Sequence, residues 1–240
     1  MTRIIAFAVL AATWNLSAAQ DVSSGEAAED VTTALPDFNG VWLAAPGSIG
    51  ARTEAVEMVG PELPQLTAEA LLIRKEYDLF VDDPGYICSP SSINRAWSNP
   101  VPIEIEQLPD RVILRYEYMD AIRTVYLDEQ SESADTPPEV LGHSIGRYEG
   151  STLVIESTGF TSGYIGTVSG TPQTETLSTV ERLTLSEDGQ RLRLEISHED
   201  PATFTTPWTS TRDFARRTDL DRLVWDCILE DAGYEEVPDP

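Results

Sequence analysis

The stretch PIEIEQLPDRVILRYEYMDAIRTVYLD, residues 102–128, decides the fold. Apolar and polar residues alternate along it in two runs, the first with Ile103 and Ile105 and the second with Val112, Leu114, Tyr116 and Tyr118. Pro109-Asp110 and Met119-Asp120 interrupt the alternation where tight turns are expected. A period of two that is broken by short turns predicts β-hairpins.

The same pattern continues toward the C-terminus. Three further hairpins are expected, from residues 144–148 with 152–156, 180–185 with 192–196, and 204–214 with 223–227. Asp188-Gly189, in the second of them, is the strongest hairpin signal in the chain. The sequence therefore predicts a mostly β fold, an antiparallel meander closed into a lipocalin-like β-barrel, because closure removes exposed strand edges. A two-sheet sandwich is the alternative.

One helix is expected ahead of most strands. Thr67 is a suitable N-cap for a helix that runs to about Phe80. Its apolar stripe has helical spacing and consists of Leu66, Ala70, Ile73 and Tyr77. Residues 36–42 are expected to form a turn and a first strand, and residues 88–100 a loop.

The N-terminal segment is typical of a secretory signal peptide. Arg3 precedes an apolar run over residues 4–16, and small residues at 17–19 suit a cleavage site. The run is too short to span a bilayer, which takes roughly 20 apolar residues. We expect cleavage after residue 19, no membrane insertion of the mature chain, and a periplasmic or secreted bacterial protein. An acidic leader over residues 20–35, a single barrel domain over 36–229 and an acidic tail over 230–240 complete the predicted organisation.

Net charge limits the classes of possible binding partner, and the cysteine content bears on the redox compartment. The formal net charge of the 240-residue chain is −25, which repels nucleic acid and anionic membrane surfaces. The only cysteines are Cys88 and Cys227. Two cysteines in an oxidising compartment most simply pair, so a disulfide is predicted. Two separate buried thiols are the alternative.

Three stretches resemble a family of secreted bacterial β-rich proteins. They are residues 142–160 (GHSIGRYEGSTLVIESTGF), residues 102–128, and residues 199–214 (EDPATFTTPWTSTRDF). Members of that family carry blocks of the form GHS-hydrophobe-GRWEGDTLVV and EDP…PWT. This chain has Tyr148 and Ser151 where tryptophan and aspartate are usual. The resemblance implies one domain with a shared architecture, and it supplies no mechanism.

Candidate catalytic residues are few. Residues 142–146 read G-x-S-x-G, but a hairpin is expected after Ser144 where a serine hydrolase needs a helix. The chain has two histidines, and His143 is the better candidate for proton transfer because it opens a strand beside a loop. A carboxylate partner would be Glu104 or Glu181. This set suits a cofactor-free lyase, isomerase or hydrolase.

Candidate ligand-binding residues come from the strand faces. Arg123 lies among apolar neighbours, and a charged side chain facing into a small barrel must be paired or must hold a ligand. Tyr116, Tyr126 and Trp208 are candidates to line the same interior. The alternative is that charges face water and aromatic rings fill a core.

The function favoured by the sequence is binding of a small apolar or amphipathic molecule in the barrel. The histidines lack metal-ligand spacing, no calcium-loop pattern occurs, and no metal or cofactor is expected. The oligomeric state is left open. An enzyme using His143, and a structural module associated with the cell envelope, are the competing functions.

Overall fold

The computed structural model describes residues 35–45, 64–90, 92–128, 136–225 and 227. The predicted signal peptide, the leader up to residue 34 and the acidic tail lie outside these residues. The helical elements are α1 (Ala68–Glu76), α2 (Leu79–Asp82), η1 (Pro84–Ile87), α3 (Ile93–Ser98) and η2 (Tyr118–Asp120). The strands are β1 (Gly40–Ala44), β2 (Ile103–Gln107), β3 (Arg111–Tyr116), β4 (Ile122–Tyr126), β5 (His143–Glu149), β6 (Thr152–Thr158), β7 (Gly163–Gly166), β8 (Thr171–Gln173), β9 (Ser178–Leu185), β10 (Arg191–Glu199) and β11 (Trp208–Arg217).

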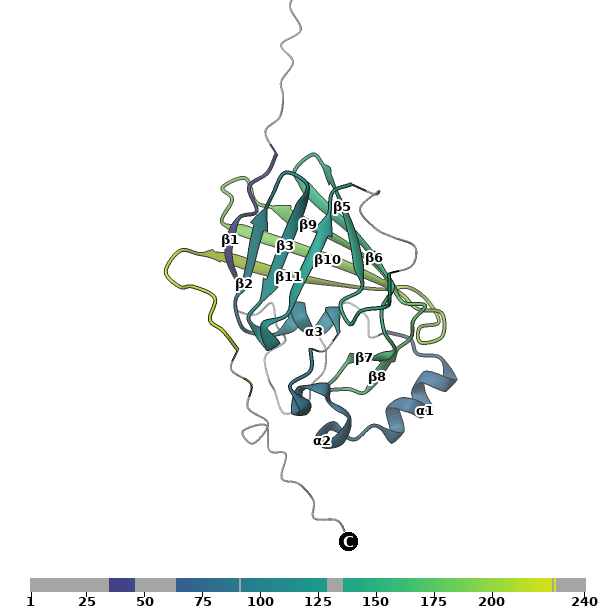
Figure 1. Cartoon of the computed structure of the whole chain (residues 1–240). Coiled ribbons are helices and arrows are strands. Elements are labelled where there is room, and N and C mark those ends of the chain that lie inside the picture. The colour runs from purple at the N-terminus through teal and green to yellow at the C-terminus, as the bar shows by residue number, and fades with distance from the viewer. Residues whose placement is uncertain (1–34, 46–63, 91, 129–135, 226, 228–240) are drawn as a thin grey trace, which may run out of the picture. The chain divides into compact units, whose positions relative to one another are not determined.

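Nine strands of the described residues close into a barrel, which confirms the predicted fold class (Figure 1). Their order is β1-β11-β10-β9-β6-β5-β4-β3-β2, and β1 closes the barrel by pairing with both β11 and β2. The neighbouring strands of the barrel pair antiparallel except at one place, where β4 and β5 are parallel. In a closed barrel with an odd number of strands, the strand directions cannot alternate all the way round, so at least one neighbouring pair must be parallel. Lipocalin barrels have eight strands, so this barrel differs from them in strand number.

The turns predicted at Pro109-Asp110, Met119-Asp120 and Asp188-Gly189 each join two paired strands. Asp188-Gly189 joins β9 to β10, and Gly189 has φ 66°, the left-handed conformation that glycine adopts without strain. Met119 and Asp120, between β3 and β4, also have positive φ, at 59° and 47°. Residues 223–225 and 227 form no strand, so the last predicted hairpin was wrong. β7 and β8 form a separate two-stranded sheet that the sequence did not predict.

The predicted helix is interrupted. Thr67 does cap α1, with its hydroxyl accepting from the backbone N–H of Ala70 at 3.1 Å. The helix ends at Glu76, because Tyr77 is extended and its hydroxyl donates to the carbonyl of Thr167. Asp78 then caps α2 by accepting from the N–H of Phe80 at 2.9 Å. Aspartate favours such a cap over a helix interior, so the cap reinforces the break that the distant Tyr77–Thr167 contact imposes.

The predicted loop at 88–100 contains the short helix α3. Ser92 caps it by accepting from the N–H of Arg95 at 3.2 Å, and its own hydroxyl donates to the carbonyl of Ile165 at 2.8 Å. Ile93, Ala96 and Trp97 are buried. Their i, i+3, i+4 spacing after a serine is the signal that could have revealed the helix. In Figure 1 α3 lies at the end of the barrel nearer α1, α2 and the β7–β8 sheet.

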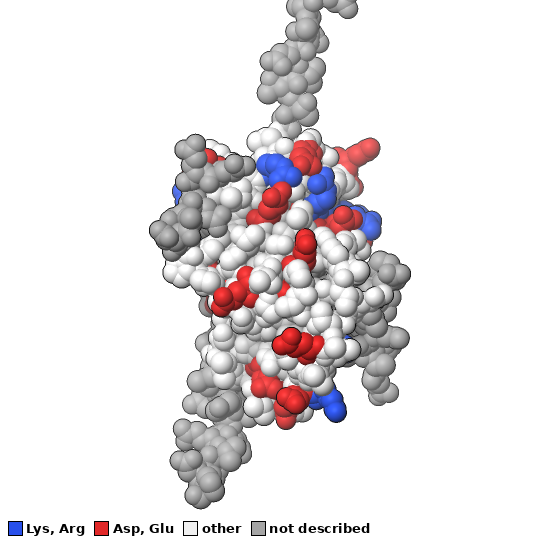
Figure 2. Space-filling view, turned by 90° about the vertical axis from the view of Figure 1, so that its right-hand side faces the viewer, with Lys and Arg blue, Asp and Glu red and all other residues white. Residues whose placement is uncertain are grey.

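The barrel interior is a packed apolar core over most of its length. Its largest fully buried side chains include Phe38, Trp42, Leu114, Leu153 and Phe214. Charged side chains of the outer surface are in contrast scattered, with basic residues beside acidic ones at the upper end of the face in Figure 2. Arg182, for instance, contacts Glu149 at 2.9 Å with both side chains more than 40% exposed. Such exposed pairs contribute little to stability.

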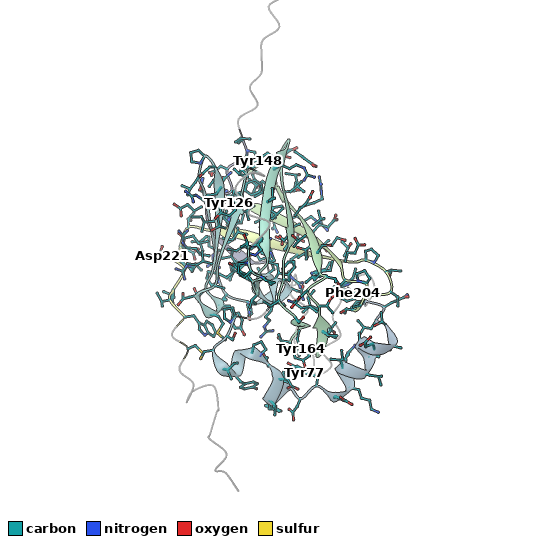
Figure 3. All side chains as sticks on the ribbon, turned by 45° about the vertical axis from the view of Figure 1, so that its right-hand side comes forward. Tyr77, Tyr126, Tyr148, Tyr164, Phe204 and Asp221 are labelled. Carbon is teal, nitrogen blue, oxygen red and sulfur yellow. A yellow bond between two sulfur atoms is a disulfide. The ribbon has the colours of Figure 1, made fainter. Side chains whose placement is uncertain are left out.

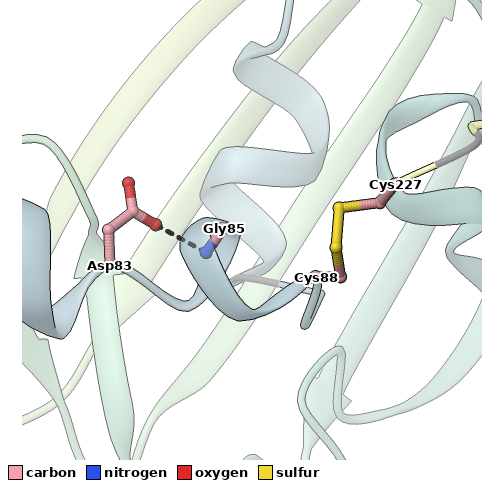
Figure 4. Close-up of a disulfide and its surroundings, with 4 residues drawn as sticks. All are labelled: Asp83, Gly85, Cys88 and Cys227. Atoms are coloured by element: carbon pink, nitrogen blue, oxygen red, sulfur yellow. Dashed lines mark hydrogen bonds between the residues drawn. A yellow bond between two sulfur atoms is a disulfide. The ribbon is translucent and has the colours of Figure 1, made fainter. Parts of the chain in front are cut away.

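The predicted disulfide is confirmed. Cys88, after η1, is bonded to Cys227, 139 positions later, and their Cα atoms are 5.8 Å apart (Figure 4). Asp83 stabilises the preceding turn by accepting from the N–H of Gly85 at 2.9 Å. Near the bond, Trp225 packs edge-on against Tyr118 with ring centroids 5.2 Å apart. The disulfide and the Trp225 contact therefore hold the C-terminal segment against Cys88, which precedes α3, and against Tyr118, which follows it.

Candidate functional site

Polar side chains gather inside the barrel at the end where α3 lies. Strand pairing places one inward residue from each of five neighbouring strands in a continuous row, which consists of Ser144, Ser157, Thr179, His198 and Trp208. Each of these side chains is buried. Alternate residues of a strand face the barrel interior, and this alternation therefore places the polar row inside together with the apolar core.

A buried ion pair lies beside the row. Nη1 of Arg123 is 2.9 Å from both carboxylate oxygens of Glu181, and the two side chains are 1% and 0% exposed. Arg123 also donates to the hydroxyls of Ser144 and Ser157, at 2.7 and 2.6 Å. Burial by itself lowers the pKa of Arg123, but the Glu181 carboxylate more than offsets this, and the net pKa is raised. Arg123 therefore stays charged inside the barrel.

α3 closes this end of the barrel. The indole N–H of Trp97 donates to Glu181 Oε2 at 3.2 Å, and its ring lies edge-on to Tyr116 with centroids 5.4 Å apart. Asn94 of the same helix accepts from Arg212 Nη2 at 3.1 Å. Because α3 binds both β9 and β11, it holds the polar end of the interior away from water.

His198 is neutral and has one free ring nitrogen. Its Nδ1 lies 3.2 Å from the carbonyl oxygen of Trp208, and its ring is stacked on the Trp208 indole at 4.7 Å. A carbonyl can only accept, so Nδ1 carries the proton and Nε2 carries the lone pair. Burial lowers the pKa of His198 to about 4, against the hydrogen bond to Trp208, which raises it.

Six buried polar atoms on β9, β10 and β11 have no hydrogen-bond partner among the described residues, and one of them, Glu181 Oε1, is held by the ion pair with Arg123. The other five are Thr179 Oγ1, His198 Nε2, Trp208 Nε1, Ser210 Oγ and Arg212 Nε. We call these five residues the β9–β11 polar face. Buried polar groups are nearly always paired in native proteins, and an exception calls for an explanation such as a bound water or ligand. The concentration of such atoms on one face makes it the candidate binding site.

The candidate catalytic residues are not brought together. His143 alternates with the buried Ser144 and so faces outward, where its Nε2 lies 2.7 Å from the carbonyl oxygen of Pro137. Glu104 is on the outer surface and contacts Arg222 at 3.6 Å. Glu181 faces inward. Glu181 is therefore separated from His143 by the barrel wall, and Glu104, although also outside, lies on β2, with β3 and β4 between it and β5. Ser144 of the G-x-S-x-G stretch lies within a strand.

The candidate ligand-binding residues divide in the same way. Arg123, Tyr116 and Trp208 are buried and face the interior. Tyr126 is only half-buried and is out of phase with the inward Arg123 and Val125, so it lies on the outer face. Figure 3 places Tyr126 toward the end of the barrel that carries Tyr148, away from Phe204.

Several residues of the site were not singled out from the sequence. Ser157, Thr179, Ser210 and Arg212 all face inward from strands that were predicted. The available signal was phase: Ser210 and Arg212 are in register with Trp208 and Phe214, which a period of two places on one face. Trp97 was missed because its helix was expected to be a loop.

His198 makes the stability depend on pH. Its pKa is about 6.5 when exposed and about 4 in the folded chain. Protonation of the unfolded chain therefore begins first as the pH falls, and stability is lost between about pH 6.5 and 4. The loss from this group is expected to reach about 3 kcal/mol. Urea unfolding at pH 7 and pH 4.5 measures it.

The control for this prediction separates His198 from other titrating groups. His198→Gln should flatten the pH dependence by most of that amount, whereas His143→Gln, on the outer face, should leave it unchanged. An equal slope in wild type and His198→Gln would contradict the assignment.

No three His, Cys, Asp or Glu side chains within the described part of the chain are grouped as metal ligands would be. None of the helices in that part is both long and apolar enough to cross a bilayer. Comparisons of the chain with protein-family models, curated proteins and solved structures found no match.

Proposed function

We propose that this chain is an exported barrel protein, periplasmic or secreted, that binds a small amphipathic molecule at the α3 end of its interior. The polar group of the molecule contacts the β9–β11 polar face. The observation that carries the proposal is the set of five buried polar atoms without partners on that face. A ligand that pairs with them supplies the hydrogen bonds that buried polar groups require.

The surroundings of the polar face suit the apolar part of such a molecule. Phe204 packs against Trp208 with ring centroids 6.0 Å apart, and Ile196 lies opposite Ser210 on the neighbouring strand. Ligand sites commonly combine apolar walls with a few polar groups that fix orientation. A ligand with one polar end and one apolar end matches this arrangement.

The competing enzymatic function receives no such support. It requires His143 to share a cavity with Glu104 or Glu181, but His143 and Glu104 lie on the outer face of the separate strands β5 and β2, and Glu181 faces the interior. The neutral His198 has its lone pair inside the barrel, but the nearest ion pair already engages Glu181. Binding without chemistry is the function that the described contacts favour.

The proposal is tested by recovering or displacing a ligand. Native mass spectrometry of the exported protein, followed by solvent extraction, should give a bound molecule near one equivalent. A hydrophobic fluorescent dye should bind the stripped protein, and the extract should displace it. The absence of both a bound molecule and dye binding would overturn the proposal.

A matched pair of variants locates the site. Ser210→Ala removes an inward hydroxyl that has no partner, so the free energy of unfolding should change by less than about 1 kcal/mol. Affinity for the extracted molecule should fall about fivefold to tenfold, the effect of one lost hydrogen bond. Thr211→Ala, at the next and outward position of β11, should bind as wild type. Equal affinity in both variants would move the site elsewhere.

A further inference from the structure

The unpartnered atoms of the β9–β11 polar face differ in what they require of a ligand. His198 Nε2 is a lone pair and needs a donor, because Nδ1 of the same ring donates to Trp208. Arg212 Nε carries a hydrogen and needs an acceptor. Ser210, which lies between them in the strand ladder, can serve as either. A matching molecule must therefore present both an acceptor and a donor.

Arg212 adds a charge requirement. No carboxylate of the described residues forms an ion pair with it, and its Nη2 donates to Asn94 Oδ1 at 3.1 Å. Burial lowers the pKa of Arg212. Arg123, by comparison, has Glu181 as a counter-ion. Arg212 is a partly buried cation with no counter-ion among the described residues, and an anionic ligand group would offset the cost of its desolvation.

The positions of these groups set the shape of the ligand's polar end. Arg212 and Ser210 are two residues apart on the inner face of β11. Ser210 pairs with Ile196, so His198 on β10 is its diagonal neighbour, a separation of roughly 7–8 Å between Cα atoms. One ligand head group can thus reach Arg212 and Ser210 with one function and His198 with another.

We propose that the ligand is an amphipathic hydroxycarboxylate. Its carboxylate accepts from Arg212 Nε and the Ser210 hydroxyl, and its hydroxyl donates to His198 Nε2. This inference rests on the proposed function and specifies its ligand class. It runs against the net charge of −25, so the preference for an anion arises from the local site.

Isothermal titration calorimetry of the full exported chain with three probes tests the ligand class. 3-Hydroxyoctanoate should bind most tightly. Octanoate should bind about tenfold more weakly, because His198 Nε2 then stays unpaired. 1,3-Octanediol should bind about 100-fold more weakly, since hydrogen bonds to charged groups are the stronger ones.

A charge variant and its control complete the test. Arg212→Gln should lower the affinity for 3-hydroxyoctanoate to that for the diol and leave diol binding unchanged, whereas Arg193→Gln, on the exposed face of β10, should change neither. If Arg212→Gln does not fold, the three wild-type affinities decide alone. Diol binding as tight as that of the hydroxy acid would overturn the ligand class and leave the proposed function standing. Failure of all three probes and of the dye would overturn both.

Discussion

Glu181→Leu is expected to lower the free energy of unfolding by about 3–5 kcal/mol, the largest effect of any single substitution considered for this protein. The change leaves Arg123 charged and 1% exposed without a counter-ion inside the barrel. It also removes the acceptor for the indole N–H of Trp97, which holds α3 against β9. Urea denaturation followed by circular dichroism measures the loss. Such a loss is a large fraction of the whole free energy of unfolding that is usual for a single domain.

Two further variants distinguish the buried charge from other consequences of the substitution. Arg123→Met combined with Glu181→Leu removes both charges and should recover most of the stability, because replacing a whole buried pair by apolar groups is often neutral. Arg182→Met, one residue along β9 on the outer face, removes an exposed partner of Glu149 and should cost less than about 1 kcal/mol. If the double variant were as unstable as Glu181→Leu, the uncompensated charge would not be the cause.

Replacing both Cys88 and Cys227 with serine is expected to lower the free energy of unfolding by about 4–5 kcal/mol in the chain-entropy model. The bond joins residues 139 positions apart, and β2 to β11 lie within the loop that it closes. Without the bond the unfolded chain gains conformational freedom, while the folded barrel keeps all of its strand pairs. Denaturation of wild type with and without reductant, compared with the double serine variant, measures the effect.

The remaining contacts of the C-terminal segment provide the control for this prediction. Arg222 contacts Asp120 at 2.9 Å and Trp225 packs on Tyr118, so these contacts hold the segment in the absence of the bond. Arg222→Gln in the oxidised protein should cost less than about 1 kcal/mol. Titration of two free thiols in the purified protein without denaturant would contradict the disulfide itself.

The strands and turns of this fold can largely be predicted from the sequence, because they depend on local chemistry. Alternation along residues 102–128 sets a period of two, and Asp188-Gly189 supplies the backbone conformation that a tight turn needs. Thr67 marks the start of a helix by capping it. The same local reasoning failed at Tyr77, where a contact with Thr167 ninety positions away ends the helix.

Only some residues of the candidate site could be predicted from the sequence. Arg123, Glu181 and Trp208 were expected to be functional from their place among apolar neighbours, and they do face the interior. His143 was preferred over His198 because it opens a strand, but the direction of its side chain depends on the strand phase, which places it outside. A shift of one residue in phase exchanges the two faces of a strand, so small errors in strand boundaries reverse such expectations.

By itself the sequence determined the fold class, the turns and the pairing partners available to the cysteines, because backbone preference and hydrophobic period act over a few residues. Only the tertiary structure decided that β4 and β5 run parallel, that α3 closes one end, and that Arg123 meets Glu181 across 58 positions. It also decided that the five atoms of the β9–β11 polar face are buried together with no hydrogen-bond partner in the described part of the chain. These outcomes depend on closure of the barrel, which brings distant strands side by side and sets which side chains share its interior.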